Sequence, residues 1–151
     1  MTTLTLHGEA AEVARGEAQA VLALVQDEER RGRLADLVAA IEDGELGEDE
    51  AQSLEEIVEL GLSTGRIRSL YGPQGEQAAL KTYRKLPRGR ELAESAGEVT
   101  AALAALAGRT LESVTVSSVG PGAWVVSLAT DSLELSVRLD RAGARVHAVG
   151  V

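Results

Sequence analysis

Hydrophobic and polar positions follow two different periods in the two parts of this chain. Up to Gly108 the apolar residues recur every three or four positions, the spacing that lines one face of an α-helix. After Gly108 apolar and polar residues alternate, most clearly from Leu133 to Asp140, which is typical of a strand with one buried and one solvent-exposed face. The change of period predicts a helical part followed by an antiparallel sheet.

The helical part is divided by glycines, prolines and charge. The periodicity predicts helices over residues 9–31, weakened at Gly16, and over 34–41, ending near Gly44. It also predicts helices that begin at the acidic run 48–50 and at Gln74, with a short helical turn over 67–71 between them that a break at Gly72-Pro73 closes. Gly61 continues the apolar face of the helix that contains it, so a neighbouring element could approach closely there.

The second part begins with the helix whose apolar stripe is the most regular. Leucine, valine and alanine recur at alternating spacings of four and three from Leu92 to Leu106, which predicts a helix over residues 90–107. Strands are predicted over 114–119, 124–129, 133–140 and 145–149, with turns at Gly120-Pro121-Gly122 and Asp140-Gly143. We expect the helix to cover the sheet face that carries Leu135, and Ser136 to lie on the solvent side.

The predicted fold class is therefore α+β: a helical N-terminal part of about four helices, then a long helix and a four-stranded antiparallel β-meander. We predict two regions, an acidic helical region over residues 1–86 with a basic C-terminal stretch, and an α+β unit over residues 87–151. A chain of 151 residues is long enough to bury a substantial apolar core.

Composition narrows the chemistry that the chain can perform. There is no cysteine, which excludes disulfides, thiolate nucleophiles and cysteine-ligated metals. The first residues have neither the basic region nor the apolar run of a signal peptide, so we expect a cytoplasmic protein without a membrane partner. Thirteen arginines against two lysines, together with abundant alanine, suggest a GC-rich bacterial genome.

Charge is distributed unevenly along the chain. Residues 1–60 carry sixteen acidic and four basic side chains, residues 61–90 carry one acidic and seven basic, and residues 91–151 carry seven acidic and four basic. A net charge of −9 opposes general attraction to nucleic acid or to an anionic membrane. The acidic first part should also repel a second copy of itself.

The basic stretch within residues 61–90 is the candidate binding surface. Lys81 and Lys85 are four residues apart on a predicted helix, so they share one face with Arg84 beside them. The candidate residues for a partner or anion patch are Arg66, Arg68, Tyr71, Lys81, Arg84, Lys85, Arg88 and Arg90. Three uses remain open: internal pairing with the acidic first part, a protein partner, or a phosphate-bearing ligand held by the glycines and arginines of residues 65–76.

The chain contains partial matches to catalytic and metal-binding motifs, but none has the surrounding structure or the ligand spacing that its chemistry requires. Gly61-Leu62-Ser63-Thr64-Gly65 matches the nucleophile elbow of hydrolases, but the preceding segment is predicted to be helical, so a helix C-terminus is the better interpretation. The acidic residues 42–50 lack the ligand spacing of a calcium loop, so a solvated turn between two helices is the better interpretation. His7 and His147 have no partner at metal-ligand spacing. We therefore predict no catalytic residue, no cofactor and no metal site.

These observations favour a non-catalytic function. We expect a small acidic bacterial adaptor, chaperone-like protein or regulatory subunit that binds another protein. The alternative is a module for a phosphate-bearing ligand, or for nucleic acid, that uses residues 66–90; we expect nucleic acid not to be the partner because the chain is acidic. An enzyme of unrecognised type is the second alternative.

Overall fold

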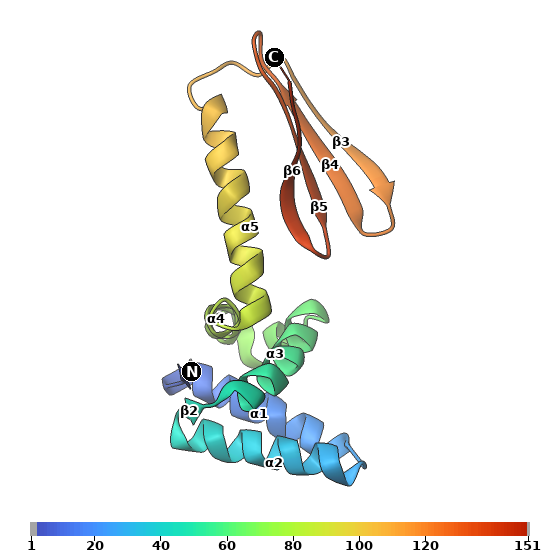
Figure 1. The fold of residues 1–151 in the computed structure, drawn as a ribbon. Helices are drawn as coiled ribbons and strands as arrows, with labels where there is room; N and C mark the ends of the chain where they lie inside the picture. The colour runs from blue at the N-terminus through green and yellow to red at the C-terminus, as the bar shows by residue number, and fades with distance from the viewer. Residues whose placement is uncertain (1–2, 151) are drawn as a thin grey trace. The chain divides into compact units, whose positions relative to one another are not determined.

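Five α-helices precede a four-stranded antiparallel sheet in residues 3–150, which the computed structural model describes (Figure 1). This confirms the predicted α+β class. The chain divides after Arg90 into a helical unit and an α+β unit. The helical unit contains β1 (Leu4–Thr5), α1 (Gly8–Leu24), α2 (Glu28–Asp43), β2 (Glu45–Leu46), α3 (Glu48–Ser63), α4 (Arg66–Tyr83) and the start of α5 (Pro87–Leu103). The α+β unit continues α5 through a 3₁₀ turn (Ala104–Leu106) into β3 (Ser113–Gly120), β4 (Ala123–Ala129), β5 (Glu134–Asp140) and β6 (Gly143–Gly150).

The first helix is shorter than the periodicity predicts. Instead of one helix over residues 9–31, α1 ends at Leu24 and α2 begins at Glu28. The side chain of Asp27 accepts a hydrogen bond from the backbone N–H of Arg30 at 3.0 Å, which caps the new helix. Gly16 does not interrupt α1. The sequence also gave no prediction of the small sheet in which Leu4 pairs with Leu46 and Thr5 with Glu45.

The helical unit packs its apolar faces into one aliphatic core. Each of α1, α2 and α3 contacts the other two, and α4 packs against α1 and α3. The largest side chains that are almost wholly buried are Val13, Leu37, Leu46, Leu54, Val58, Ile67 and Leu86. Gly61 permits the close approach that its position predicts, because a Cβ there would lie 2.6 Å from Ile67 Cδ1.

The break predicted at Gly72-Pro73 is present as a kink inside α4. Gly72 has φ 74° and ψ −176°, a backbone conformation that favours glycine, and Pro73 begins the second half of the helix. The second half buries Ala79 and Tyr83 and exposes Lys81, and Lys85 is exposed in the turn that follows α4. The kink therefore sets the direction of the helical segment that carries Lys81 and leads into the turn that contains Lys85.

The start of α5 is held by two carboxylates of α3. Pro87 occupies the first turn, where a helix does not need its missing N–H. The backbone N–H of Arg88 donates to Glu55 Oε2 at 2.9 Å, and Arg88 Nε pairs with Glu59 Oε1 at 3.2 Å. A carboxylate at a helix N-terminus satisfies a free donor and opposes the positive end of the helix dipole. The acidic α3 thus fixes the position of the first turn of α5.

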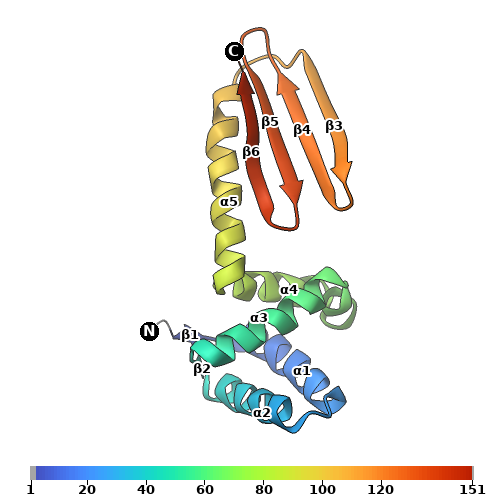
Figure 2. The same cartoon turned by 45° about the vertical axis from the view of Figure 1, so that its right-hand side comes forward.

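The four long strands form a meander in the order β3-β4-β5-β6, so β3 and β6 are its edges (Figure 2). Cross-strand pairs such as Val116 with Val126 and Val126 with Val137 place the valines and leucines on one face. On that face Leu135 and Val137 are 2% and 5% exposed. Six of its other large apolar residues are 38% or more exposed: Val114, Val116, Trp124, Leu139, Val146 and Val149. The expected cover of this face is therefore incomplete.

The opposite face of the sheet is less exposed than its polar pattern predicts. Ser136 was expected on a wet face, yet it is only 8% exposed, and its hydroxyl lies 3.0 Å from that of Ser127 on the neighbouring strand. Val125 on the same face is 9% exposed. Arg138 on that face pairs with Asp140 at 3.0 Å. The small hydroxyls satisfy each other, so this face can be buried without leaving a polar atom unpaired.

We predict that residues 87–151 fold without the helices that precede them. Their elements include a helix and four consecutively paired strands, so every strand has its partner within the fragment. Nuclear magnetic resonance of the isolated fragment should show dispersed amide signals. Collapsed or aggregated signals would show instead that the helical unit supplies part of the core.

We predict that two adjacent substitutions in β5 differ in cost. Leu135→Ala should lower the free energy of unfolding by about 2–5 kcal/mol, because the side chain is almost fully buried. Ser136→Ala removes one hydrogen bond and should cost about 0.5–1.5 kcal/mol. Urea denaturation of the full chain measures both. Equal losses would contradict the assignment of the core to the Leu135 face.

Candidate functional site

The basic stretch begins with an ion pair to a buried carboxylate. Arg66 lies in the first turn of α4, and its Nε donates to the two carboxylate oxygens of Glu17 at 3.2 and 3.0 Å. The Glu17 side chain is 3% exposed, whereas that of Arg66 is 49% exposed. A carboxylate taken out of water has to be paired and hydrogen-bonded. The guanidinium of Arg66 is therefore used within the helical unit.

Tyr71 completes the surroundings of Glu17. Burial raises the pKa of the Tyr71 hydroxyl, and the charge of Glu17 together with their side-chain hydrogen bond raises it further, against an opposing effect of Arg66. Tyr71 thus stays protonated at neutral pH and donates to the carboxylate. Gly16 makes room for it, because a Cβ on Gly16 would overlap the Tyr71 hydroxyl. A Cβ on Gly61 would come within 3.2 Å of Glu17 Oε2.

Three further arginines of the stretch have contacts inside the helical unit. Arg68 Nη1 lies 3.5 Å from Glu76 Oε1. Arg88 pairs with Glu59 as described above, and Arg90 Nη2 donates to the backbone carbonyl of Lys85 at 2.8 Å. Burial raises the pKa of the nearby Tyr83 hydroxyl; the charge of Glu59 adds to this shift and that of Arg88 opposes it. Five of the eight predicted residues are thus engaged internally: Arg66, Arg68, Tyr71, Arg88 and Arg90.

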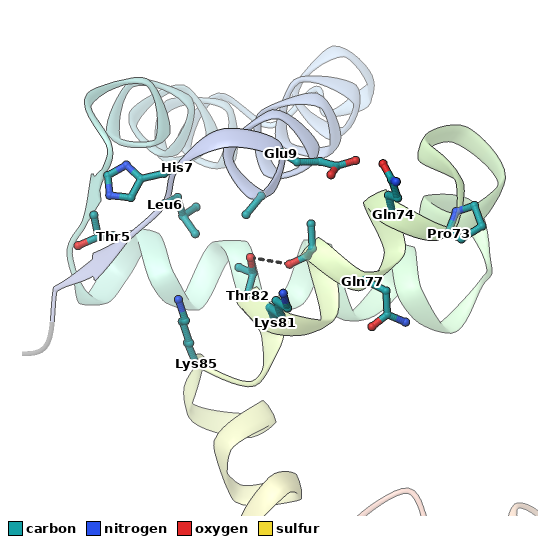
Figure 3. Close-up of a pocket in the computed structure, with 12 residues that line it drawn as sticks. Thr5, Leu6, His7, Glu9, Pro73, Gln74, Gln77, Lys81, Thr82 and Lys85 are labelled. Carbon is teal, nitrogen blue, oxygen red and sulfur yellow. Dashed lines mark hydrogen bonds between the residues drawn. The ribbon is translucent and has the colours of Figure 1, made fainter.

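The three remaining residues, Lys81, Arg84 and Lys85, are exposed and form no ion pair among residues 3–150. Lys81 and Lys85 are the only lysines of the chain, and both line one cavity of about 580 Å³ (Figure 3). Arg84 does not line it. Of the basic residues of the predicted patch, only the two lysines therefore line this cavity, and none of the arginines does.

The cavity lies where the start of α1 faces the second half of α4. From the first segment it is lined by Thr5, Leu6, His7, Glu9 and Ala10, and from α4 and the residues after it by Pro73, Gln74, Gln77, Ala78, Lys81, Thr82 and Lys85. Figure 3 shows His7 and Lys85 at one end and the two glutamines towards the other. The Thr82 hydroxyl is occupied, since it donates to the Ala78 carbonyl at 3.1 Å.

The polar lining is rich in donors. The residues that line the cavity contribute two ammonium groups, two side-chain amides and an imidazole, but only one carboxylate, that of Glu9. A volume of this size accommodates a small ligand or a short segment of a peptide. The arrangement can bind an acidic group, but it contains no nucleophile held against a base.

The sequence pattern did not indicate that His7, Gln74 and Gln77 line a common cavity. His7 precedes α1 as its N-cap residue and makes no side-chain cap. One signal pointed there: threonine and leucine alternate from Thr3 to Leu6, which is the pattern of a strand. The positions of Gln74 and Gln77 in the lining depend on the kink at Gly72. The sequence does not show in which direction that kink turns the second half of α4.

Ser63 occupies the last turn of α3, and its hydroxyl donates to the carbonyl of Leu60 at 3.2 Å. This is the helix terminus that the sequence favoured over a nucleophile elbow. In the acidic segment 42–50, Glu45 and Leu46 form β2 and pair with β1, so the segment is more than a solvated turn. Among residues 3–150 no group of three or more histidine, aspartate or glutamate side chains could hold a metal ion.

Comparison with known proteins gives no match: no family model, no curated protein and no solved structure is similar to this chain. In the described part of the chain, no helix has the length and apolar character needed to cross a membrane.

We predict that Arg66 and Arg68, two positions apart in α4, differ in their contribution to stability. Arg66→Ala should lower the free energy of unfolding by about 1–3 kcal/mol, because it leaves the buried Glu17 without its cation. Arg68→Ala removes an exposed pair and should cost about 0–1 kcal/mol. Urea denaturation compares the two variants. A loss for Arg68→Ala as large as that for Arg66→Ala would show that burial of Glu17 is not the cause.

Proposed function

We propose that this protein is a non-catalytic adaptor, chaperone-like protein or regulatory subunit, and that it binds an acidic segment of another protein in the cavity lined by Lys81 and Lys85. In this proposal it works in the bacterial cytoplasm, as its composition suggests. The observation that supports the proposal is the contrast between the cations of the basic stretch: most of its arginines are used inside the helical unit, whereas Lys81 and Lys85 line the cavity and form no ion pair with any residue of 3–150.

The chemistry of the lining fits a peptide segment. Lysine ammonium groups attract carboxylates without imposing the planar geometry that arginine requires, which suits a partner of variable conformation. Gln74 and Gln77 carry both donors and acceptors, so they can pair with the backbone of an extended segment. The carboxylate of Glu9 opposes a ligand that is anionic throughout, but tolerates one with separate acidic side chains.

A phosphate-bearing ligand is the second candidate, and one observation favours it. The first turn of α1 borders the cavity, and its N-cap residue His7 makes no side-chain hydrogen bond to it. The free N–H groups and the positive end of a helix favour an anion. Glu9 in the same turn weakens this attraction, which is why we favour the acidic protein segment.

Affinity purification from the native host tests the proposal. We expect the double variant Lys81→Glu/Lys85→Glu to lose the partner that the wild-type chain recovers, with affinity reduced about tenfold or more in reconstitution, the equivalent of about 1.4 kcal/mol. The variant Arg15→Glu/Arg33→Glu makes the same change in net charge on other exposed positions of the helical unit and should keep the partner. Retention of every partner by the lysine variant would contradict the proposal.

Two measurements accompany this comparison. Thermal melting should show that the lysine variant stays within about 1 kcal/mol of the wild type, because exposed charges near a helix end contribute little to stability. Titration of the purified protein with inorganic phosphate, followed by amide chemical shifts, distinguishes the second candidate. Saturable shifts at the cavity that disappear in the lysine variant would favour a phosphate-bearing ligand over a protein segment.

A further inference from the structure

The edge strand β3 is open to pairing. It is bonded to β4 on one side only, and seven of its eight residues are exposed. An edge strand presents a row of free N–H and C=O groups, and proteins usually protect such edges with charged residues, proline, a bulge or a covering element. The sequence of β3, Ser-Val-Thr-Val-Ser-Ser-Val-Gly, contains no charged residue and no proline.

The two edges of the sheet differ in this respect. The other edge, β6, carries Arg145 and His147, and its register with β5 shifts between Ser136 and Val137, so that it contains an extra residue there. A bulge of this kind twists an edge away from further pairing. In β3 the only irregularity falls between Ser118 and Gly120, at the end of the strand. From Ser113 to Ser118 the edge is regular and unprotected.

The sequence of this edge is self-complementary in the antiparallel direction. Residues Ser113-Val114-Thr115-Val116-Ser117 read the same forwards and backwards about Thr115. If two copies pair about a twofold axis at Thr115, each Thr115 faces the other, Val114 faces Val116, and Ser113 faces Ser117. Hydroxyl side chains then lie opposite hydroxyl side chains on one face of the sheet, and valines lie opposite valines on the other face. Both kinds of cross-strand pair are favourable.

Charge and exposed apolar surface agree with this register. The chain is acidic overall, yet none of these pairs contains a charge, and Glu112 falls opposite Ser118 instead of opposite its own copy. Val114 and Val116 are 53% and 64% exposed, so pairing covers apolar surface that the fold leaves open. The same register brings the exposed Leu111 opposite the exposed Val119 at each end.

We propose that the occupant of the β3 edge is a second copy of this chain, joined by antiparallel β3–β3 pairing about Thr115 into a continuous eight-stranded sheet. The proposal uses only the α+β unit and is independent of the cavity in the helical unit. Because a single strand pair buries less area than a standard interface, we expect a dimer that dissociates on dilution.

Charge substitution at Thr115 tests the pairing on the full-length protein. In the proposed dimer two Thr115 side chains are direct neighbours, so Thr115→Lys and Thr115→Glu each place like charges together and should give monomers in sedimentation velocity. An equimolar mixture of the two variants should restore the dimer. Ala148→Lys on the β6 edge is the control and should dimerise like the wild type.

The absence of cysteine from the chain allows a second test. Thr115→Cys should form a disulfide-linked dimer under mild oxidation, because directly opposed residues in an antiparallel pair lie about 4.5–5.5 Å apart between their Cα atoms. Ala148→Cys should stay monomeric on denaturing gels. A wild-type chain that is monomeric at all concentrations, or a dimer that both charged variants leave intact, would overturn the proposal. A mixture that stays monomeric, or Thr115→Cys that does not cross-link, would overturn this register.

Discussion

A buried carboxylate imposes the strongest constraint on the helical unit. Glu17 lies inside the unit, and only a cation and donors brought to it from elsewhere can offset its loss of water. Arg66 and Tyr71 supply them from α4, so α1 and α4 have to meet at this point. The glycines at positions 16 and 61 are needed because there is no space for a side chain around the group. The ion pair and the close packing at the glycines therefore both stabilise the contact between α1 and α4 at Glu17.

The same principle sorts the cations of the basic stretch. In the described part of the helical unit, Glu17, Glu59 and Glu76 each form an ion pair with an arginine. A planar guanidinium with several fixed donors suits such pairs better than an ammonium group does. The two lysines are left beside the cavity, where a mobile point charge can serve a binding role. A stretch that is uniform in charge along the sequence is thus divided in space into a structural set and an available set.

In the α+β unit the organising constraint is the pairing of backbone groups. Consecutive hairpins satisfy β4 and β5 on both sides, but a meander cannot avoid leaving two edges. The bulge and Arg145 of β6 protect one edge from further pairing, whereas β3 has neither a bulge nor a charged residue along its regular part. The exposed valines of β3 and Trp124 of β4 continue the apolar face beyond its buried centre. The two edges are therefore unequal in a way that composition alone does not show.

The sequence by itself determined the fold class, the order of the main helices and of the four long strands, and the meander, because these follow from the period of apolar residues and from turn chemistry, both of which act over a few positions. It also identified the close approach at Gly61 and the break at Gly72-Pro73. Only the tertiary structure decided which basic residues pair, because Glu17 and Arg66 are 49 positions apart and no local pattern encodes that distance. For the same reason the sequence missed the β1–β2 pair and the position of His7 in the lining of the cavity. It also placed Ser136 in solvent, since burial of a hydroxyl depends on a partner in the next strand.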